Sequence, residues 1–225
     1  MPVVPWTEDS PLFEGTRIVF GVPRRPTLPA GRDNDASSIL TQRFDEALVY
    51  ASELHRAQRR TGTAVPYLSH LLGTAALALE MGADEDQAIA ALLHDSVEDQ
   101  GGTPRLDDIS ARFGDRVAGI VADCSDWDGN GTPPPWRARK EAYIACLAAK
   151  SAEALLVILA DKTHNARTIV DHHTVHGADL WNRFAAGRDG SLWYYTALAE
   201  AFSRAFPGAG AARLAKLVGR MSKLD

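Results

Sequence analysis

Residues 90–99 read Ala-Ala-Leu-Leu-His-Asp-Ser-Val-Glu-Asp, an apolar run that leads into four ionisable side chains. The apolar spacing predicts one helix over residues 84–99, stopped by the glycines at positions 101 and 102. On such a helix His94 and Asp95 are about 100° apart, and Glu98 and Asp99 follow one turn later on the same faces. Ionisable groups at the end of a buried stripe are costly unless they are paired or bind a metal ion.

Two other segments place similar side chains after apolar runs. His70 lies in a predicted helix, and Asp161 follows the apolar residues 155–160. Together with His94 and Asp95 they offer two imidazoles and two carboxylates but no thiolate. Such a mixed set favours an octahedral Mn²⁺, Fe²⁺ or Mg²⁺ with open positions for water. Because further carboxylates follow one turn away, the predicted chemistry is metal-assisted hydrolysis.

The composition narrows the class of protein. The chain has 225 residues, 45% of them hydrophobic and 24% charged, which is typical of a globular protein with a sizeable core. Its net charge of −5 and the lack of a basic stripe argue against a nucleic-acid partner. Two cysteines are too few for a disulfide framework and fit a reducing cytosol. With neither a secretory signal nor a long apolar run, we expect a cytoplasmic protein without a membrane partner.

The sequence divides into a short arm and one domain. Residues 1–35 contain half of the 12 prolines and are predicted to form a loosely ordered arm. Residues 36–225 show helical periodicity and almost no strand-like alternation, which predicts an all-α, single-domain helical bundle. Besides 84–99, helices are expected at residues 37–54, 67–81, 104–113, 115–124, 136–149, 152–171, 175–186, 191–206 and 210–224.

These motifs resemble those of the HD-domain metal-dependent phosphohydrolases. More narrowly, they are similar to the hydrolase domain of the RelA/SpoT alarmone enzymes and their small single-domain relatives. The resemblance covers about residues 39–171 in the family's order and implies an HD-type bundle. It rests on the elements His-Asp-x-x-Glu-Asp and Ala-Asp-x-x-His-Asn, with support from His55-Arg-Ala-Gln-Arg-Arg60, Pro66-Tyr67-Leu-Ser-His70 and Phe113-Gly114.

The resemblance implies a role for each matching residue. It assigns a divalent metal, usually Mn²⁺ and alternatively Fe²⁺, Mg²⁺ or Zn²⁺, to the ligands His70, His94, Asp95 and Asp161. It makes Glu98 and Asp99 the pair that activates or positions the attacking water. The family reaction removes pyrophosphate from the 3′ position of guanosine tetra- or pentaphosphate, and some small relatives act on other 3′-phosphorylated nucleotides. The nucleotide is expected to contact Arg60, Tyr67, Asn165 and Thr168.

Two departures from the family pattern fall at the substrate end. The loop from Arg60 to Pro66 is one residue longer than usual, and Thr61 stands where the pattern has lysine. Lys162 replaces an arginine, so a phosphate contact expected there keeps its charge but loses the bidentate fork. The main hypothesis is a guanosine 3′,5′-bis(diphosphate) 3′-pyrophosphohydrolase. The alternatives are an HD phosphohydrolase for another nucleotide and a metal- or nucleotide-binding module without turnover, which a water-activating carboxylate pair disfavours.

Several other polar groups have two interpretations. His55 is either a pocket residue or a histidine packed beside Gln58, whereas His164 is expected to support the metal ligands rather than join them. Three basic residues after the proline run either draw phosphates into the cleft or form a solvated helix face: Arg137, Arg139 and Lys140.

Three further motifs are interpreted as structural. The histidines at positions 172, 173 and 176 are attributed to a helix end rather than to a second metal site. The aromatic residues 193–195 are assigned to the core. Residues 126–131 match the first half of a calcium-binding loop, but Arg137 stands where the bidentate glutamate is needed, so a turn-rich loop is expected.

Overall fold

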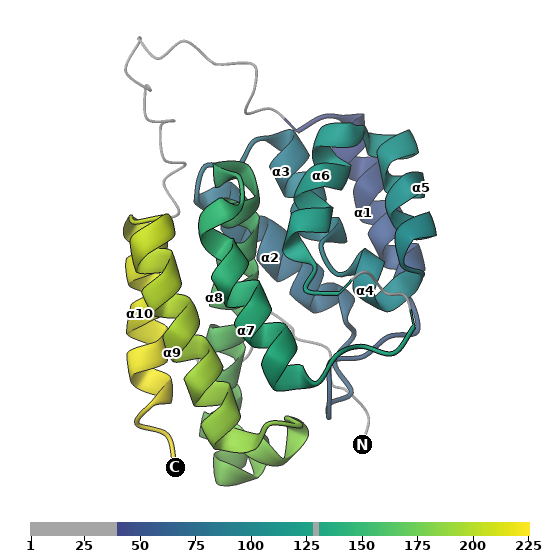
Figure 1. Ribbon diagram of the computed structural model, residues 1–225. Coiled ribbons are helices and arrows are strands. Elements are labelled where there is room, and N and C mark those ends of the chain that lie inside the picture. The colour runs from purple at the N-terminus through teal and green to yellow at the C-terminus, as the bar shows by residue number, and fades with distance from the viewer. Residues whose placement is uncertain (1–39, 128–130) are drawn as a thin grey trace, which may run out of the picture. The chain divides into compact units, whose positions relative to one another are not determined.

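The computed structural model describes residues 40–127 and 131–225, and the chain in these ranges is built of helices (Figure 1). Within them the only strand-like pairing is one bridge between Arg59 and Pro66, which confirms the all-α class. The predicted arm of residues 1–35 lies outside the described residues. The helices are α1 (Gln42–Leu54), α2 (Leu68–Glu80), α3 (Glu85–Leu93), α4 (Ser96–Gln100), α5 (Thr103–Phe113), α6 (Asp115–Cys124), α7 (Trp136–Cys146), η2 (Leu147–Ala149), α8 (Ala152–His176), η3 (Gly177–Arg183), α9 (Gly187–Ala205) and α10 (Ala209–Met221).

The helix predicted over residues 84–99 is divided in two. α3 ends at Leu93 and α4 begins at Ser96, so His94 and Asp95 form a junction instead of lying inside one helix. The backbone of Asp95 has a ψ of −1°, away from the usual helical value. Both helices contact α1, but their other partners differ, since α3 packs on α2, α6 and α8 whereas α4 packs on α5. Apolar spacing does not reveal such a change of direction, and the prediction of one helix is corrected.

The predicted break after residue 171 is also corrected. α8 continues to His176, and the separate helix predicted over 175–186 is replaced by the 3-10 helix η3. The change occurs at Gly177, whose φ of +54° is favoured by glycine and ends an α-helix. Histidine is favoured at the C-terminal end of a helix, where the helix dipole is negative. The histidines at positions 172, 173 and 176 therefore allow α8 to continue beyond the end that its apolar pattern predicts.

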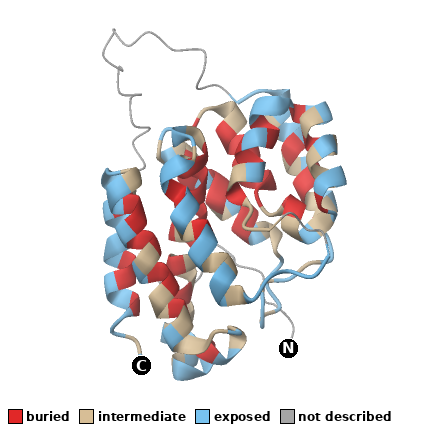
Figure 2. Ribbon diagram, viewed as in Figure 1, coloured by how far each residue is buried: buried red, intermediate tan, exposed pale blue. Residues whose placement is uncertain are grey.

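The helices that carry the polar motifs pack against one another. α2 contacts both α3 and α8, and α3 contacts α8. Every side chain from Ala88 to Leu93 is fully buried, so α3 passes through the core and its end delivers polar groups to the interior. Figure 2 shows the buried residues concentrated on these helices and on the faces of α9 and α10 that meet α8.

A capping box fixes where α3 begins. The Asp84 carboxylate accepts from the backbone N–H of Gln87, and the Gln87 side chain accepts from the backbone N–H of Asp84, both at 3.0 Å. This reciprocal pair satisfies two N–H groups that a helix start leaves free. No helix in the described ranges is both long and apolar enough to cross a membrane.

Candidate metal centre

Four polar side chains meet where α2, α3 and α8 pack together. His70 comes from α2, His94 and Asp95 from the junction of α3 and α4, and Asp161 from α8. The His70 Nε2 atom lies 3.3 Å from His94 Nε2 and 3.2 Å from Asp161 Oδ1. Asp95 Oδ2 lies 3.0 Å from His94 Nε2 and 3.5 Å from His70 Nε2. The structure therefore brings together all four residues that the sequence analysis names as ligands.

The spacing and burial of this cluster fit a divalent cation. Neighbouring ligands of an octahedral ion with bonds of about 2.1 Å lie about 3 Å apart, close to the distances between these atoms. His70, His94 and Asp161 are buried, and their ligand atoms all lie within 4.8 Å of one another. The Asp95 side chain keeps 22% of its surface exposed. One side of the cluster is therefore open to an approaching substrate.

The electrostatics of the cluster also favour a cation. Burial alone would raise the pKa values of Asp95 and Asp161, but His94 beside Asp95 and Lys162 beside Asp161 hold both well below the usual range. Burial would likewise lower the pKa of His94, but the two carboxylates raise it well above its ordinary value. A field that draws a proton to an imidazole also draws a metal ion, which displaces that proton on binding. This donor set fits a divalent metal.

The two carboxylates are held by neighbours that are not ligands. The Tyr67 hydroxyl donates to Asp95 Oδ2 at 2.6 Å, and Asn165 Nδ2 donates to Asp161 Oδ1 at 2.5 Å. Such contacts fix the orientation of a ligand and tune its basicity. Tyr67 and Asn165, expected from the sequence to contact the nucleotide, therefore hold two of the candidate metal ligands in place.

The two imidazoles are oriented through their second nitrogens. His94 Nδ1 lies 2.9 Å from the carbonyl oxygen of Ala91, which only accepts, so this nitrogen carries a proton and Nε2 faces the cluster. His70 Nδ1 lies 3.0 Å from His164 Nδ1. Burial and the neighbouring His70 lower the pKa of His164 to about 3, which favours its neutral form. If His70 Nε2 binds the metal, His70 Nδ1 carries the proton and donates to His164 Nδ1. His164 thus has the supporting position expected from the sequence.

Gly73 leaves the space that the His164 ring occupies. A Cβ atom at this position would lie 2.2 Å from His164 Nε2, far inside van der Waals contact. We expect Gly73→Ala to displace the ring from His70 and to weaken Mn²⁺ binding about 10- to 100-fold, as measured by calorimetric titration of metal-free protein. Gly119→Ala is the matched control, because a Cβ there meets nothing within 4 Å. Equal Mn²⁺ affinity in the two variants would contradict the role assigned to His164.

Glu98 and Asp99, the predicted catalytic carboxylates, follow Asp95 on α4. Glu98 Oε1 accepts from the backbone N–H of Asp126 at 2.7 Å, and Asp99 Oδ2 accepts from Gln58 Nε2 at 2.8 Å. Burial, then the charges of Asp126 and Asp95, raises the pKa of Glu98 to about 7. Burial and Asp95 also raise the pKa of Asp99. A carboxylate that titrates near neutral pH is suited to take up and release a proton.

A buried ion-pair cluster holds the loop before α7, and sequence reasoning missed it. The Asp126 side chain is only 4% exposed and bonds to both Arg139 and Lys140. These two basic side chains are therefore mostly buried and paired with a carboxylate, and they do not form a solvated helix face. No spacing rule links a loop carboxylate to the following helix, so the sequence carried no signal for this contact. Because the N–H of Asp126 holds Glu98, the cluster positions a predicted catalytic group. The rest of the loop that resembles a calcium site includes residues 128–130, which lie outside the described residues.

Gln58, just after α1, contacts the same region, and no sequence motif predicted a role for it in the site. Its Oε1 atom lies 2.6 Å from His55 Nδ1, while its Nε2 atom donates to Asp99. The buried His55 ring stacks on Tyr67 with centroids 5.3 Å apart and planes 15° apart. Of the two interpretations of His55, the structure supports the one in which it packs beside Gln58.

The Lys162 side chain is mostly buried and packs against the cluster. Its Nζ atom is 2.6 Å from Asp161 Oδ2, and its side chain is 15% exposed. Burial would lower its pKa, but Asp161 raises it well above the usual value. The ammonium also lies 5.5 Å from the centroid of the Tyr143 ring. Its charge is thus compensated by a candidate metal ligand, and a contact with substrate phosphate stays a prediction.

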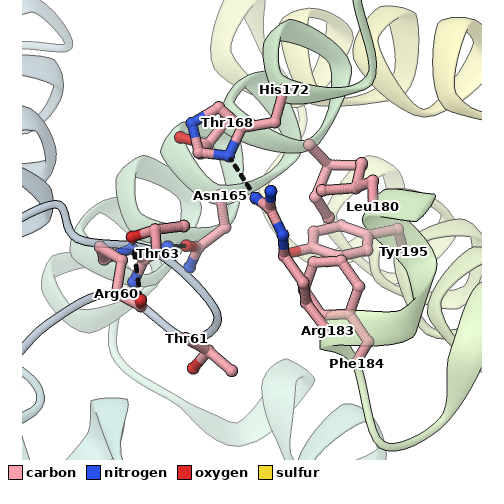
Figure 3. Close-up of a pocket in the computed structure, with 11 residues that line it drawn as sticks. Arg60, Thr61, Thr63, Asn165, Thr168, His172, Leu180, Arg183, Phe184 and Tyr195 are labelled. Carbon is pink, nitrogen blue, oxygen red and sulfur yellow. Dashed lines mark hydrogen bonds between the residues drawn. The ribbon is translucent and has the colours of Figure 1, made fainter. Parts of the chain in front are cut away.

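A pocket of about 230 Å³ adjoins the cluster (Figure 3). Arg60, Asn165 and Thr168, three of the residues expected to bind nucleotide, line it. Arg60 Nη2 donates to Asn165 Oδ1 at 2.5 Å, and the Arg60 guanidinium lies 5.3 Å from the Tyr67 ring centroid. Asn165 therefore connects the pocket to the metal cluster, because its other amide atom bonds Asp161.

The remaining histidine and aromatic motifs have structural surroundings. His173 Nε2 lies 2.9 Å from an Asp225 carboxylate oxygen, and His172 Nδ1 faces Arg183. Among the described residues, the histidines in the last turns of α8 do not belong to a group of His, Cys, Asp or Glu side chains placed to hold a metal ion. Tyr194 and Tyr195 are buried, as expected of core residues, and Tyr195 also lines the pocket.

Comparison with known proteins agrees with this geometry. The family model of the HD domain matches residues 47–192. The guanosine-3′,5′-bis(diphosphate) 3′-pyrophosphohydrolase MESH1 of Xenopus tropicalis is 37% identical over 139 residues, which are 60% of this chain and 72% of that protein. The bifunctional (p)ppGpp synthase/hydrolase SpoT of Escherichia coli (strain K12) is 32% identical over 130 residues. That match covers 57% of this chain but only 18% of SpoT.

Two solved structures are similar over most of the chain. One is described as a metazoan ortholog of SpoT that hydrolyzes ppGpp; it has a TM-score of 0.68 and 27% identity, and the match covers 83% of this chain and 99% of that one. The other, lmo0812 from Listeria monocytogenes EGD-e, has a TM-score of 0.59 and 29% identity, over 72% of this chain and 100% of that one. Since the family model spans more than half of the sequence and carries the cluster built above, the chain belongs to the HD domain family.

Proposed function

We propose that this chain is a Mn²⁺-dependent phosphohydrolase that removes pyrophosphate from the 3′ position of guanosine 3′,5′-bis(diphosphate). The observation that carries the proposal is the convergence of two imidazoles and two carboxylates beside Glu98, next to a pocket lined by Arg60 and Asn165. The likeness to MESH1 supports the substrate, because that protein's name specifies this activity. The nitrogen and oxygen donors support Mn²⁺ over a structural zinc.

In the proposed reaction, a water oxygen bonds to the phosphorus atom attached to the 3′ oxygen. The bond from that phosphorus to the 3′ oxygen breaks, and pyrophosphate and guanosine diphosphate are released. A divalent cation supplies Lewis acidity to this chemistry. Glu98 takes a proton from the water, and a proton returns to the 3′ oxygen. Asp99, held by Gln58, helps to orient the water, while Arg60 and Asn165 hold the nucleotide.

We also propose a cellular location and a class of partner for the protein. A free nucleotide substrate favours a cytoplasmic location with a small-molecule partner, and the net charge of −5 disfavours nucleic acid. Part of that negative charge lies in the cluster itself, where a bound cation compensates it.

A panel of 3′-phosphorylated guanosine and adenosine nucleotides tests the substrate. After incubation with Mn²⁺, ion-exchange chromatography should show guanosine diphosphate and pyrophosphate from guanosine 3′,5′-bis(diphosphate). Thr61, which stands where the family pattern has lysine, favours the second candidate, an HD phosphohydrolase for a different nucleotide. Hydrolysis of another member of the panel, without pyrophosphate release from the guanosine compound, would establish that candidate instead. Tight binding without any turnover would identify a binding module.

A further inference from the structure

The pocket beside the metal cluster carries positive charge without a matching carboxylate. Its lining includes two guanidinium groups, from Arg60 and Arg183, and no acidic side chain. Arg60 belongs to the segment between α1 and α2, whereas Arg183 is the last residue of η3. In Figure 3 the two lie on opposite sides of the opening, with Asn165 between them. Such a pocket suits an anionic part of a ligand.

The position of Arg183 is fixed by packing. A Cβ atom added to Gly62, whose φ is +68°, would lie 2.7 Å from Arg183 Cγ, so the arginine stem rests against the Gly62 backbone. The guanidinium Nη1 lies 3.4 Å from His172 Nδ1. No carboxylate among the described residues forms an ion pair with Arg183. Most of its five N–H donors therefore remain available, on a side chain that is already held in place.

Several other cations near the cluster already have partners. Lys162 pairs with Asp161, and both Arg139 and Lys140 pair with Asp126. Arg60 is committed to Asn165 and lies over a tyrosine ring. A substrate with four phosphate groups entering an acidic protein needs positive charge that no carboxylate neutralises. Arg60 and Arg183 both supply it in this pocket, and Arg183 also has most of its N–H donors available.

We propose that Arg183 binds the 5′-diphosphate of the nucleotide, the group that the proposed reaction leaves intact. The inference rests on the proposed function, since it takes the 3′ end of the substrate to lie at the metal cluster. The planar guanidinium donates to two phosphate oxygens, and its contacts with His172 and with the Gly62 backbone keep it directed into the pocket. Arg183 thus selects nucleotides that carry a 5′ phosphate, and it lies outside the motifs that define the family resemblance.

Arg183→Gln is the informative variant, because it keeps the aliphatic stem on Gly62 and removes the charge. We expect KM for guanosine 3′,5′-bis(diphosphate) to rise about 10- to 100-fold with little change in kcat. KM for guanosine 3′-diphosphate, which lacks the 5′ phosphates, should stay unchanged. Arg183→Lys should recover part of the loss, and Arg220→Ala, an exposed arginine outside the pocket lining, is the control. Equal effects on both substrates, or none on either, would overturn the proposal.

A binding measurement separates this inference from the proposed reaction. Guanosine 5′-diphosphate carries the group that Arg183 is expected to hold but no bond for the enzyme to cleave. Calorimetry should show its affinity falling about 10- to 100-fold in Arg183→Gln, with guanosine as the comparison ligand. If the wild-type protein hydrolyses no guanosine nucleotide, the proposed function fails, yet this result still decides the subsite. Unchanged affinity for guanosine 5′-diphosphate would overturn it.

Discussion

Asp95→Ala should lose its bound metal and its hydrolase activity together. Asp95 Oδ2 lies 3.0 Å from His94 Nε2 and 3.5 Å from His70 Nε2, so alanine removes one of four donors and half of the carboxylate charge of the cluster. Lewis-acid stabilisation contributes several kcal/mol to such reactions, and we expect turnover to fall on the order of 1,000-fold. Metal content by mass spectrometry and pyrophosphate release measure the two effects on the same sample.

Two further variants make the Asp95 result interpretable. Asp107→Ala removes an exposed carboxylate of α5 and should change neither quantity. Tyr67→Phe keeps the ligand but removes the hydroxyl that donates to it, so metal affinity should fall by the smaller factor of about 10 to 100. An Asp95→Ala protein that keeps full turnover would show that the cluster is not the catalytic centre.

Glu98→Gln should keep the metal and still lose most of its activity. Glutamine can accept the hydrogen bond from the Asp126 N–H but cannot take a proton from water, and general-base catalysis contributes about 10²- to 10⁴-fold. The pKa of Glu98, about 7, is raised mainly by burial, and a bound cation lowers it. In the wild type, kcat should therefore rise with pH through a pKa below 7, because the carboxylate must be ionised. This acid limb should be missing in the variant.

The control for Glu98 is Glu141→Gln, which neutralises an exposed glutamate of α7 that pairs with Arg137. Its pH profile should match that of the wild type. If Glu98→Gln retained the same acid limb and the same kcat, the proton would be taken by another group. Asp99, whose pKa is also raised by burial, would then be the first residue to test.

The grouping of the four candidate metal ligands was predictable because its signals are local. His94 and Asp95 follow an apolar run that had to be buried, and the same holds for Asp161. Their spacing on helices limits where such side chains point, and the resemblance to a known family adds the order of the motifs. The junction between α3 and α4 was not predictable in this way, because it depends on which neighbours each helix packs against.

The surroundings of the cluster were harder to predict because they join distant parts of the chain. Asp126 pairs with two cations of α7, which removes them from substrate binding. Arg183 packs against Gly62, which is far away in the sequence, and lines the pocket although its own segment contains no recognisable motif. These contacts follow from the packing of whole elements, and neither periodicity nor residue spacing encodes them.

The most direct test of the account is a titration of metal-free protein with Mn²⁺, with pyrophosphate release from guanosine 3′,5′-bis(diphosphate) followed at each addition. A single cluster formed by His70, His94, Asp95 and Asp161 predicts no release without metal and a rise that levels off at one equivalent of Mn²⁺ per chain. Full turnover by the metal-free protein, or no pyrophosphate release at any Mn²⁺ concentration, would contradict it.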